Sequence, residues 1–145
     1  VVGGHKYEAI LKVLNKYPKI DVVFNKNYMD GMFSSVKTGF RNIQGEKVFF
    51  IPGDYPLISA KTYRELLDVN EDIVIPAYNG QKGHPVLFKS RVIQLLYKSD
   101  YKNLREFIYG YGFSTIEVDD PKILIDIDTM QDYRKIINDS GKFVK

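Results

Sequence analysis

The feature that most constrains the fold is an unbroken apolar run from Val48 to Ile51, which Pro52 and Gly53 terminate. A continuous run of this length is typical of a strand buried on both faces of a parallel sheet. Asp54 follows at once, and Gly53 gives a ligand close access to it. Because ligands of open α/β sheets bind beyond the carboxyl ends of the strands, Asp54 is a candidate ligand for a hard cation. The alternative is a turn aspartate that bonds its own backbone.

Length and composition limit the classes of protein to consider. With 145 residues, of which 44% are hydrophobic and 27% charged, the chain can form one globular domain spanning 1–145 with a substantial core. A net charge of +3 suits an anionic small molecule but is too small for a nucleic-acid-binding surface. The absence of Cys excludes disulfides, thiolate metal sites and cysteine nucleophiles, and two His residues far apart in sequence disfavour a zinc site.

Neither a membrane span nor a targeting segment can be recognised. No stretch approaches the ~18 consecutive apolar residues of a span, and no segment resembles a signal peptide. We therefore expect a soluble, cytoplasmic protein that binds no membrane. The sequence starts without Met, and Val1-Val2 before Gly3-Gly4 has the pattern of the end of a strand. We therefore expect the chain to be the remainder of a longer protein.

The apolar periodicity predicts helices and strands that alternate along the chain, which indicates an α/β fold with a largely parallel sheet. The predicted helices cover 6–17, from Ser34 or Ser35 to Gly45, from Ser59 onward, 91–97, 103–109, and from Thr129 to about 137. The predicted strands cover 21–24, 48–51, 73–75 with Pro76 at its end, 85–88, 114–118 and 124–128. The regions 78–88 and 114–128 have the pattern of antiparallel additions.

A second acidic signal lies in the strand predicted over 124–128. Asp126 and Asp128 are two residues apart, so both carboxylates face the same side, while Ile125 and Ile127 face the other. Two adjacent carboxylates repel each other unless solvent or a cation separates them. Asp128 has an alternative role at the start of the next helix, where a negative charge is favourable and Thr129 resembles a capping residue. We therefore prefer Asp126 as the cation ligand.

Asp54 and Asp126 would both stand at the carboxyl ends of strands. If the strands are neighbours, the two carboxylates can hold one Mg²⁺, which usually takes one or two protein carboxylates and completes its shell with water and phosphate oxygens. Such a site handles nucleoside triphosphates, because the metal neutralises charge and orients the reacting oxygens.

Two further segments have the composition of ligand-binding loops. In Gly83-His84-Pro85, the glycine permits close approach and the imidazole can bond an anion or a heterocycle; the alternative is a surface turn with an incidental His. In the segment leading to Ser34 and Ser35, a helix N-terminus with hydroxyl groups suits a phosphate, a ribose or a base edge. The alternative there is plain helix capping.

Taken in order, the sequence resembles the MobA-like nucleotidyltransferases, and most nearly their molybdenum cofactor cytidylyltransferase branch. The matching segments are Val2-Gly3-Gly4-His5, the stretch 25–36, Gly53-Asp54-Tyr55-Pro56-Leu57, Gly83-His84-Pro85-Val86-Leu87-Phe88, and Leu124-Ile125-Asp126-Ile127-Asp128-Thr129. Gly-Asp-x-Pro recurs across nucleotidyltransferases, whereas the run that begins Gly-His-Pro is the most discriminating. The resemblance covers nearly the whole chain.

The resemblance implies a fold, a reaction and a set of site residues. The fold is a Rossmann-like three-layer α/β/α sandwich with a mostly parallel mixed sheet. The reaction is Mg²⁺-dependent transfer of CMP from CTP, or from another nucleoside triphosphate, to molybdopterin, with release of pyrophosphate and a molybdenum hydroxylase as recipient of the product. The implied residues are Asp54 and Asp126 for catalysis, Asp54, Asp126 and Asp128 for the metal, Asn25, Ser34, Ser35 and Gly53 for the nucleotide, and Gly83, His84 and Pro85 for the acceptor.

The sequence departs from the family pattern in two respects. The family opens with a strand and a glycine-rich loop that cradles the triphosphate, and this sequence begins at about the second strand. Phe33 also stands where a small Ser is common. Two alternatives therefore stay open. One is a transferase of the same fold that acts on a sugar or alditol phosphate, and the other is a non-catalytic molybdenum cofactor binding module.

Overall fold

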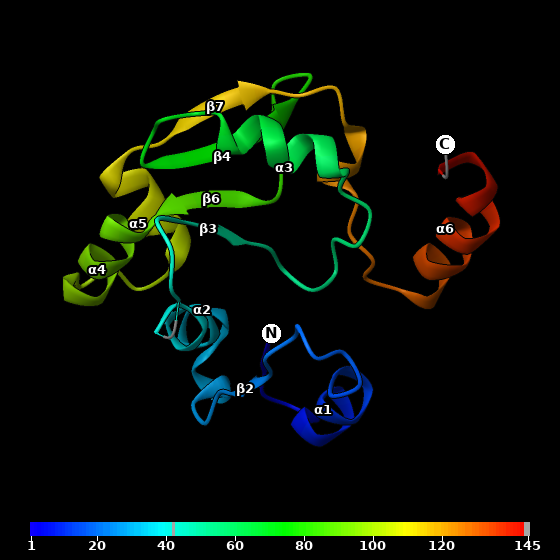
Figure 1. Ribbon diagram of the computed structural model, residues 1–145, viewed down its shortest axis with the longest axis horizontal. Helices are drawn as coiled ribbons and strands as arrows, with labels where there is room; N and C mark the ends of the chain where they lie inside the picture. The colour runs from blue at the N-terminus through cyan, green and yellow to red at the C-terminus, as the bar shows by residue number, and fades with distance from the viewer. Residues whose placement is uncertain (42, 144–145) are drawn as a thin grey trace. The chain divides into compact units, whose positions relative to one another are not determined.

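A computed structural model describes residues 1–41 and 43–143, with side chains as far as 138 (Figure 1). It has a mixed α/β, Rossmann-like fold, which confirms the predicted class. Two short strands, β1 (Val2–Gly3) and β2 (Val23–Phe24), pair in parallel. The larger sheet has the order β3-β6-β4-β5, and β7 also pairs with β4. Its strands are β3 (Lys47–Phe50), β4 (Ile73–Tyr78), β5 (Gln81–Lys82), β6 (Val86–Lys89) and β7 (Ser114–Glu117).

Helices alternate with these strands. They are α1 (Tyr7–Leu14), α2 (Met32–Phe40), α3 (Ala60–Leu67), α4 (Ser90–Lys98), α5 (Leu104–Tyr111) and α6 (Met130–Phe143), with the 3₁₀ turns η1 (Tyr28–Asp30) and η2 (Pro121–Leu124). The predicted cap of α3 is confirmed, because the Thr62 N–H donates to Ser59 Oγ at 3.2 Å. The predicted capping box is also present: the Asp132 N–H donates to Thr129 Oγ1, and the Thr129 N–H donates to Asp132 Oδ2. Among the described residues, no helix is long and apolar enough to cross a membrane.

The predicted start and end of α2 were wrong. The helix begins at Met32, so Ser34 and Ser35 lie inside its first turns and do not cap it. Gly31, with φ of +86°, is the capping residue, a backbone conformation that glycine adopts without strain. Ser34 Oγ donates to the Gly31 carbonyl at 2.8 Å, which uses the hydroxyl inside the turn. The helix ends at Phe40, before the predicted stop at Gly45.

Four strand predictions also need correction. β3 was expected to be buried on both faces, but its residues are only half-buried, because β3 stands at one end of the strand order. β7 was expected to be an antiparallel addition, but it pairs in parallel with β4. β4 does not end before Pro76 but runs to Tyr78, since proline lacks only its N–H and the Pro76 carbonyl still accepts from the Gly83 N–H at 2.9 Å. The residues 125–128 form no strand. The Ile125 N–H does not bond to a neighbouring strand but donates to the Lys122 carbonyl, which closes a turn. In the region 78–88, which was expected to be an antiparallel addition, β5 pairs antiparallel with β4.

The chain divides into two compact units, each with its own packing. The first contains Val1–Val48, Glu71–Ile73 and Phe88–Phe113. In it, Phe40 of α2 packs edge-to-face on Phe88 of β6, with ring centroids 5.5 Å apart. The second contains Phe49–Asn70, Val74–Leu87 and the residues from Ser114 onward. Its core joins α3 to the strands through a cluster that comprises Leu66, Val74 and Leu87 with Phe49, Val69 and Ile116 packed against it.

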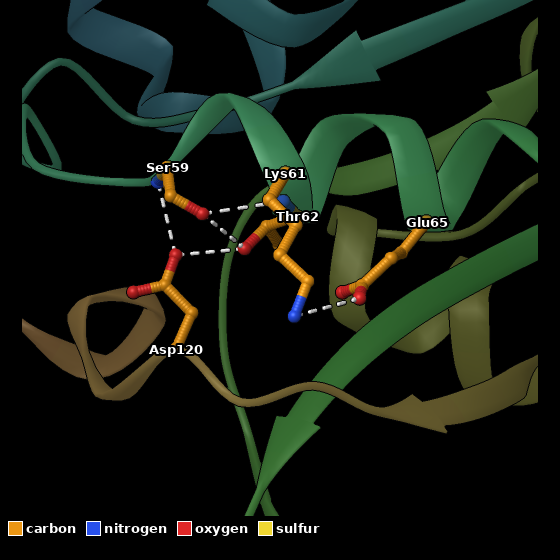
Figure 2. A network of polar contacts seen from close by, with 5 residues as sticks. All are labelled: Ser59, Lys61, Thr62, Glu65 and Asp120. Carbon is orange, nitrogen blue, oxygen red and sulfur yellow. Dashed lines mark hydrogen bonds and ion pairs between the residues drawn. The ribbon is translucent and has the colours of Figure 1, made fainter.

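A buried carboxylate ties the start of α3 to the segment after β7 in the second unit (Figure 2). Asp120 is only 5% exposed, and its Oδ2 accepts from the Ser59 N–H at 2.9 Å and from the Thr62 hydroxyl at 2.7 Å. Its Oδ1 accepts from the Lys122 N–H at 3.2 Å. Burial by itself would raise the pKa of Asp120, but these hydrogen bonds outweigh it and the pKa is lowered. Asp120 is therefore charged at neutral pH and stabilises the fold.

We expect Asp120→Asn to lower the free energy of unfolding at pH 7 by about 1–3 kcal/mol, because an amide cannot accept all of these hydrogen bonds. Asp119→Asn is the matched control, since Asp119 is exposed. Because folding lowers the pKa of Asp120, the ionised carboxylate stabilises the folded state at every pH above its unfolded pKa of about 3.9. This stabilisation is lost as the pH falls through the pKa of the folded state. Urea unfolding should therefore show the difference between Asp120→Asn and wild type shrinking below about pH 4. A difference independent of pH would contradict this assignment.

Candidate functional site

The candidate site is in the second unit, at the turn that follows β3. The Tyr55 N–H donates to the Pro52 carbonyl at 3.4 Å, which closes the turn that carries Gly53 and Asp54. The side chain of Asp54 is half-buried, and its Oδ1 is buried without a hydrogen-bond partner among the described residues. A buried carboxylate oxygen that lacks a protein donor is costly unless a ligand or ion satisfies it. Asp54 thus has the properties expected of a ligand-binding carboxylate.

A single backbone hydrogen bond brings the second acidic segment to this turn: the Ile127 N–H donates to the Asp54 carbonyl at 2.9 Å. Although residues 125–128 form no strand, the predicted alternation is present, with Asp126 and Asp128 exposed and the two isoleucines half-buried. Burial raises the pKa of Tyr55, and the charges of Asp126, Asp54 and Asp128 raise it further. The three carboxylates are therefore near enough to Tyr55 for their charges to act on its hydroxyl.

The third predicted segment lies at the same place. Gly83 approaches the chain so closely that a Cβ there would stand 2.3 Å from the Ile123 carbonyl oxygen, and the His84 N–H donates to that same oxygen at 3.0 Å. The His84 ring meets Tyr55 edge-on, with centroids 4.6 Å apart, and contacts Phe50 at 6.0 Å. Pro85 is buried and joined to His84 by a cis peptide bond.

The environment of His84 keeps its imidazole neutral. Burial lowers the pKa of His84, and the nearby charge of Asp54 opposes this only in part. Nδ1 is buried and has no hydrogen-bond partner within the described chain. A neutral imidazole with an unpartnered nitrogen can donate to or accept from a ligand, depending on its tautomer.

The acidic side chains differ in whether they have hydrogen-bond partners, and this distinguishes structural carboxylates from candidate ligands. Asp120 and Asp132 accept several hydrogen bonds, and Asp72 in the first unit accepts from Arg91 Nε at 3.0 Å. Asp54, Asp126 and Asp128 make no side-chain hydrogen bond or ion pair with any described residue. Within the described ranges, no group of three His, Asp or Glu side chains converges closely enough to hold a metal ion by itself. One or two carboxylates suffice for Mg²⁺, so the donors present fit such an ion, and the full three-carboxylate ligand set stays a prediction.

The residues predicted to bind the nucleotide, apart from Gly53, lie in the first unit. Asn25 is 2% exposed, and its Nδ2 donates to Ser34 Oγ at 2.8 Å and to Ser35 Oγ at 3.0 Å. Its Oδ1 accepts from the Asn27 N–H at 3.0 Å and from Thr38 Oγ1 at 3.2 Å. Asn25 therefore fixes the loop before α2 against that helix. Contact of these side chains with a nucleotide stays a prediction.

Sequence reasoning missed two residues in the second unit. Tyr55 contacts His84, and the charges of the three carboxylates act on it. Its position inside the Gly-Asp-x-Pro turn was the available signal. Asp120 was missed as a structural anchor, although an Asp before Pro121 is a recognisable signal for the start of a helical turn.

Gly83 provides a test of this local geometry. We expect Gly83→Ala to lower the free energy of unfolding by about 1–3 kcal/mol, because the added methyl group collides with the Ile123 backbone. Gly53→Ala is the matched control for stability, since a Cβ at Gly53 meets nothing within 4 Å. Urea unfolding of both variants measures the effect. Equal stability of the two would show that the Gly83 backbone is not held against Ile123.

The family model and the related proteins that match this chain are all described as nucleotidyltransferases. The family model described as "MobA-like NTP transferase domain" matches residues 1–113, which include Asp54 and His84. The chain is 26% identical over 135 residues to the molybdenum cofactor cytidylyltransferase of Escherichia coli, covering 92% of this chain and 70% of that protein. It is 27% identical over 140 residues to the 2-phospho-L-lactate guanylyltransferase of Methanocaldococcus fervens, covering 88% and 63%.

The fold is similar to that of solved nucleotidyltransferases. A nucleotidyl transferase from Methanothermobacter thermautotrophicus superimposes with a TM-score of 0.79 and 20% identity, covering 98% of this chain and 72% of that one. Because the family model matches most of the sequence, the result does not depend on any single relative. The chain belongs to the MobA-like NTP transferase domain family.

Proposed function

We propose that the protein is a Mg²⁺-dependent cytidylyltransferase that transfers CMP from CTP to the phosphate of molybdopterin and releases pyrophosphate. In this reaction an oxygen of the acceptor phosphate bonds to the α-phosphorus of CTP, and the bond from that phosphorus to the pyrophosphate oxygen breaks. The observation that carries the proposal is the hydrogen bond from Ile127 to the Asp54 carbonyl, because it gathers carboxylates without protein partners beside a neutral His84.

Each side chain would have a distinct task. Asp54 would supply a buried oxygen that is free for a metal. Asp126 or Asp128 would supply a second, exposed carboxylate from the segment that the Ile127 N–H joins to Asp54. When bound there, Mg²⁺ would offset the negative charge of the phosphates during transfer. His84 would present an uncharged imidazole to the acceptor, with its ring packed against Tyr55 and Phe50. Gly83 and Pro85, its chain neighbours, are the other residues predicted for the acceptor.

The nucleotide would engage the residues predicted for it in the first unit. Asn25, Ser34 and Ser35 form a fixed polar cluster beside the N-terminus of α2, a kind of position that suits phosphate or ribose oxygens. Phe33 follows Met32 in that helix, and the Lys37 ammonium group lies 4.4 Å from its ring centroid. This pair is a candidate contact for the base.

The choice of CTP and molybdopterin is supported by the likeness to the Escherichia coli enzyme. A molybdenum hydroxylase as recipient of the product belongs to the same proposal. The likeness to the archaeal protein favours a second candidate, guanylyl transfer from GTP to a phosphorylated hydroxy acid, which uses the same bond changes at phosphorus. Transfer to a sugar or alditol phosphate and a non-catalytic molybdenum cofactor binding role are the remaining alternatives.

The first test replaces Asp54. In the full-length protein, we expect Asp54→Asn to reduce kcat/KM for pyrophosphate release by about a hundredfold or more, because the metal contributes several kcal/mol to catalysis. The Mn²⁺ affinity, measured by electron paramagnetic resonance of the free ion, should fall in parallel. Asp119→Asn is the matched control and should leave both quantities unchanged. Full activity of Asp54→Asn would refute the catalytic proposal.

The second test separates the candidate substrates. Wild-type protein is given CTP or GTP with reduced molybdopterin, 2-phospho-L-lactate or a sugar phosphate, and pyrophosphate release is measured. We expect the CTP and molybdopterin pair to be preferred by at least about tenfold, since a site built to bond one partner rejects poorer matches. Preference for GTP with the hydroxy acid would favour the second candidate. Tight molybdopterin binding without any turnover would favour the binding module.

A further inference from the structure

Tyr55 connects the acidic segment to the histidine segment. It stands between Asp54 and Pro56 in the turn after β3, and its half-buried ring lies edge-on to His84 at 4.6 Å with an interplanar angle of 62°. His84 is fixed by its bond to the Ile123 carbonyl, and Asp54 is fixed by its bond to the Ile127 N–H. The orientation of Tyr55 is therefore set by two anchored neighbours within one unit.

The hydroxyl of Tyr55 has no hydrogen-bond partner among the described residues. Some tyrosines of the chain use theirs within the fold: Tyr7 donates to the Val22 carbonyl at 3.4 Å and Tyr111 to Asp72 at 2.5 Å. A tyrosine phenol is ordinarily protonated at neutral pH. It is thus an available donor in a site whose other polar groups are mainly acceptors.

We propose that Tyr55 is an acceptor-binding residue, whose hydroxyl donates a hydrogen bond to the phosphate monoester that attacks the nucleotide. This inference rests on the proposed function, but it holds for either candidate acceptor, since molybdopterin and 2-phospho-L-lactate both present a phosphate monoester. A dianionic phosphate is the strongest hydrogen-bond acceptor that such a substrate offers. Contact with His84, on the segment predicted to bind the acceptor, favours this phosphate over the triphosphate of the nucleotide.

The test removes the hydroxyl and keeps the ring. In the full-length protein with Mg²⁺, we expect Tyr55→Phe to weaken binding of glycerol 3-phosphate, a simple monoester probe followed by its ³¹P shift, by about tenfold or more. CTP affinity, measured by calorimetry, should change less than about twofold. Tyr63→Phe is the matched control, because Tyr63 is also half-buried in the second unit and its ring contacts Phe49 at 5.0 Å.

Three other outcomes would contradict the proposal, each in a different way. Unchanged monoester affinity in Tyr55→Phe, while wild type binds both ligands, overturns the role of the hydroxyl and leaves the proposed function intact. An equal loss of CTP and monoester affinity also overturns it, because the hydroxyl would then serve the nucleotide. If wild type shows metal-dependent binding of neither CTP nor GTP, both candidate transfer reactions fail, and the assignment of Tyr55 fails with them.

Discussion

The candidate site depends on one backbone hydrogen bond, from the Ile127 N–H to the Asp54 carbonyl at 2.9 Å. The charged side chains on the two segments that this bond joins, Asp54, Asp126 and Asp128, are all acidic, and they repel one another until a cation or solvent separates them. Side-chain attraction therefore cannot assemble the site before a ligand arrives. The backbone does so instead, supported by the burial of Ile123 and the bond from His84 to its carbonyl.

The carboxylates of the second unit divide according to what they bond. Asp120 is buried and surrounded by donors, which satisfy its charge and hold α3 to the segment after β7. Asp54 has a buried oxygen for which the described chain provides no donor. The same residue type thus stabilises the fold at one position and remains ready for a ligand at the other. The difference lies in the neighbouring N–H and O–H groups, which come from distant parts of the sequence.

Local pattern accounts for much of what could be predicted from sequence. The caps at Ser59 and Thr129 and the outward-facing Asp126 and Asp128 depend on near neighbours. The apolar run 48–51 correctly predicts a strand, but not its burial on both faces, because β3 stands at one end of the strand order. What was mispredicted depends on distant contacts. The segment 125–128 has the alternation of a strand, but its central N–H bonds to Asp54. The parallel direction of β7 is set by the path of the chain and not by its residues. The role of Asp120 likewise required knowing that Ser59 and Thr62 lie beside it.

The chain is about equally identical in sequence to relatives that are named for different nucleotides, and the chemistry of the candidate site is compatible with both. The groups gathered around Asp54 and His84 are carboxylates, an imidazole and a phenol, which suit metal ions and phosphate oxygens and contain nothing that distinguishes cytosine from guanine. A cytidylyltransferase and a guanylyltransferase can therefore share this chemistry, and both are about equally identical to this chain, at 26% and 27%. Selection between the two bases would then depend on residues outside this group.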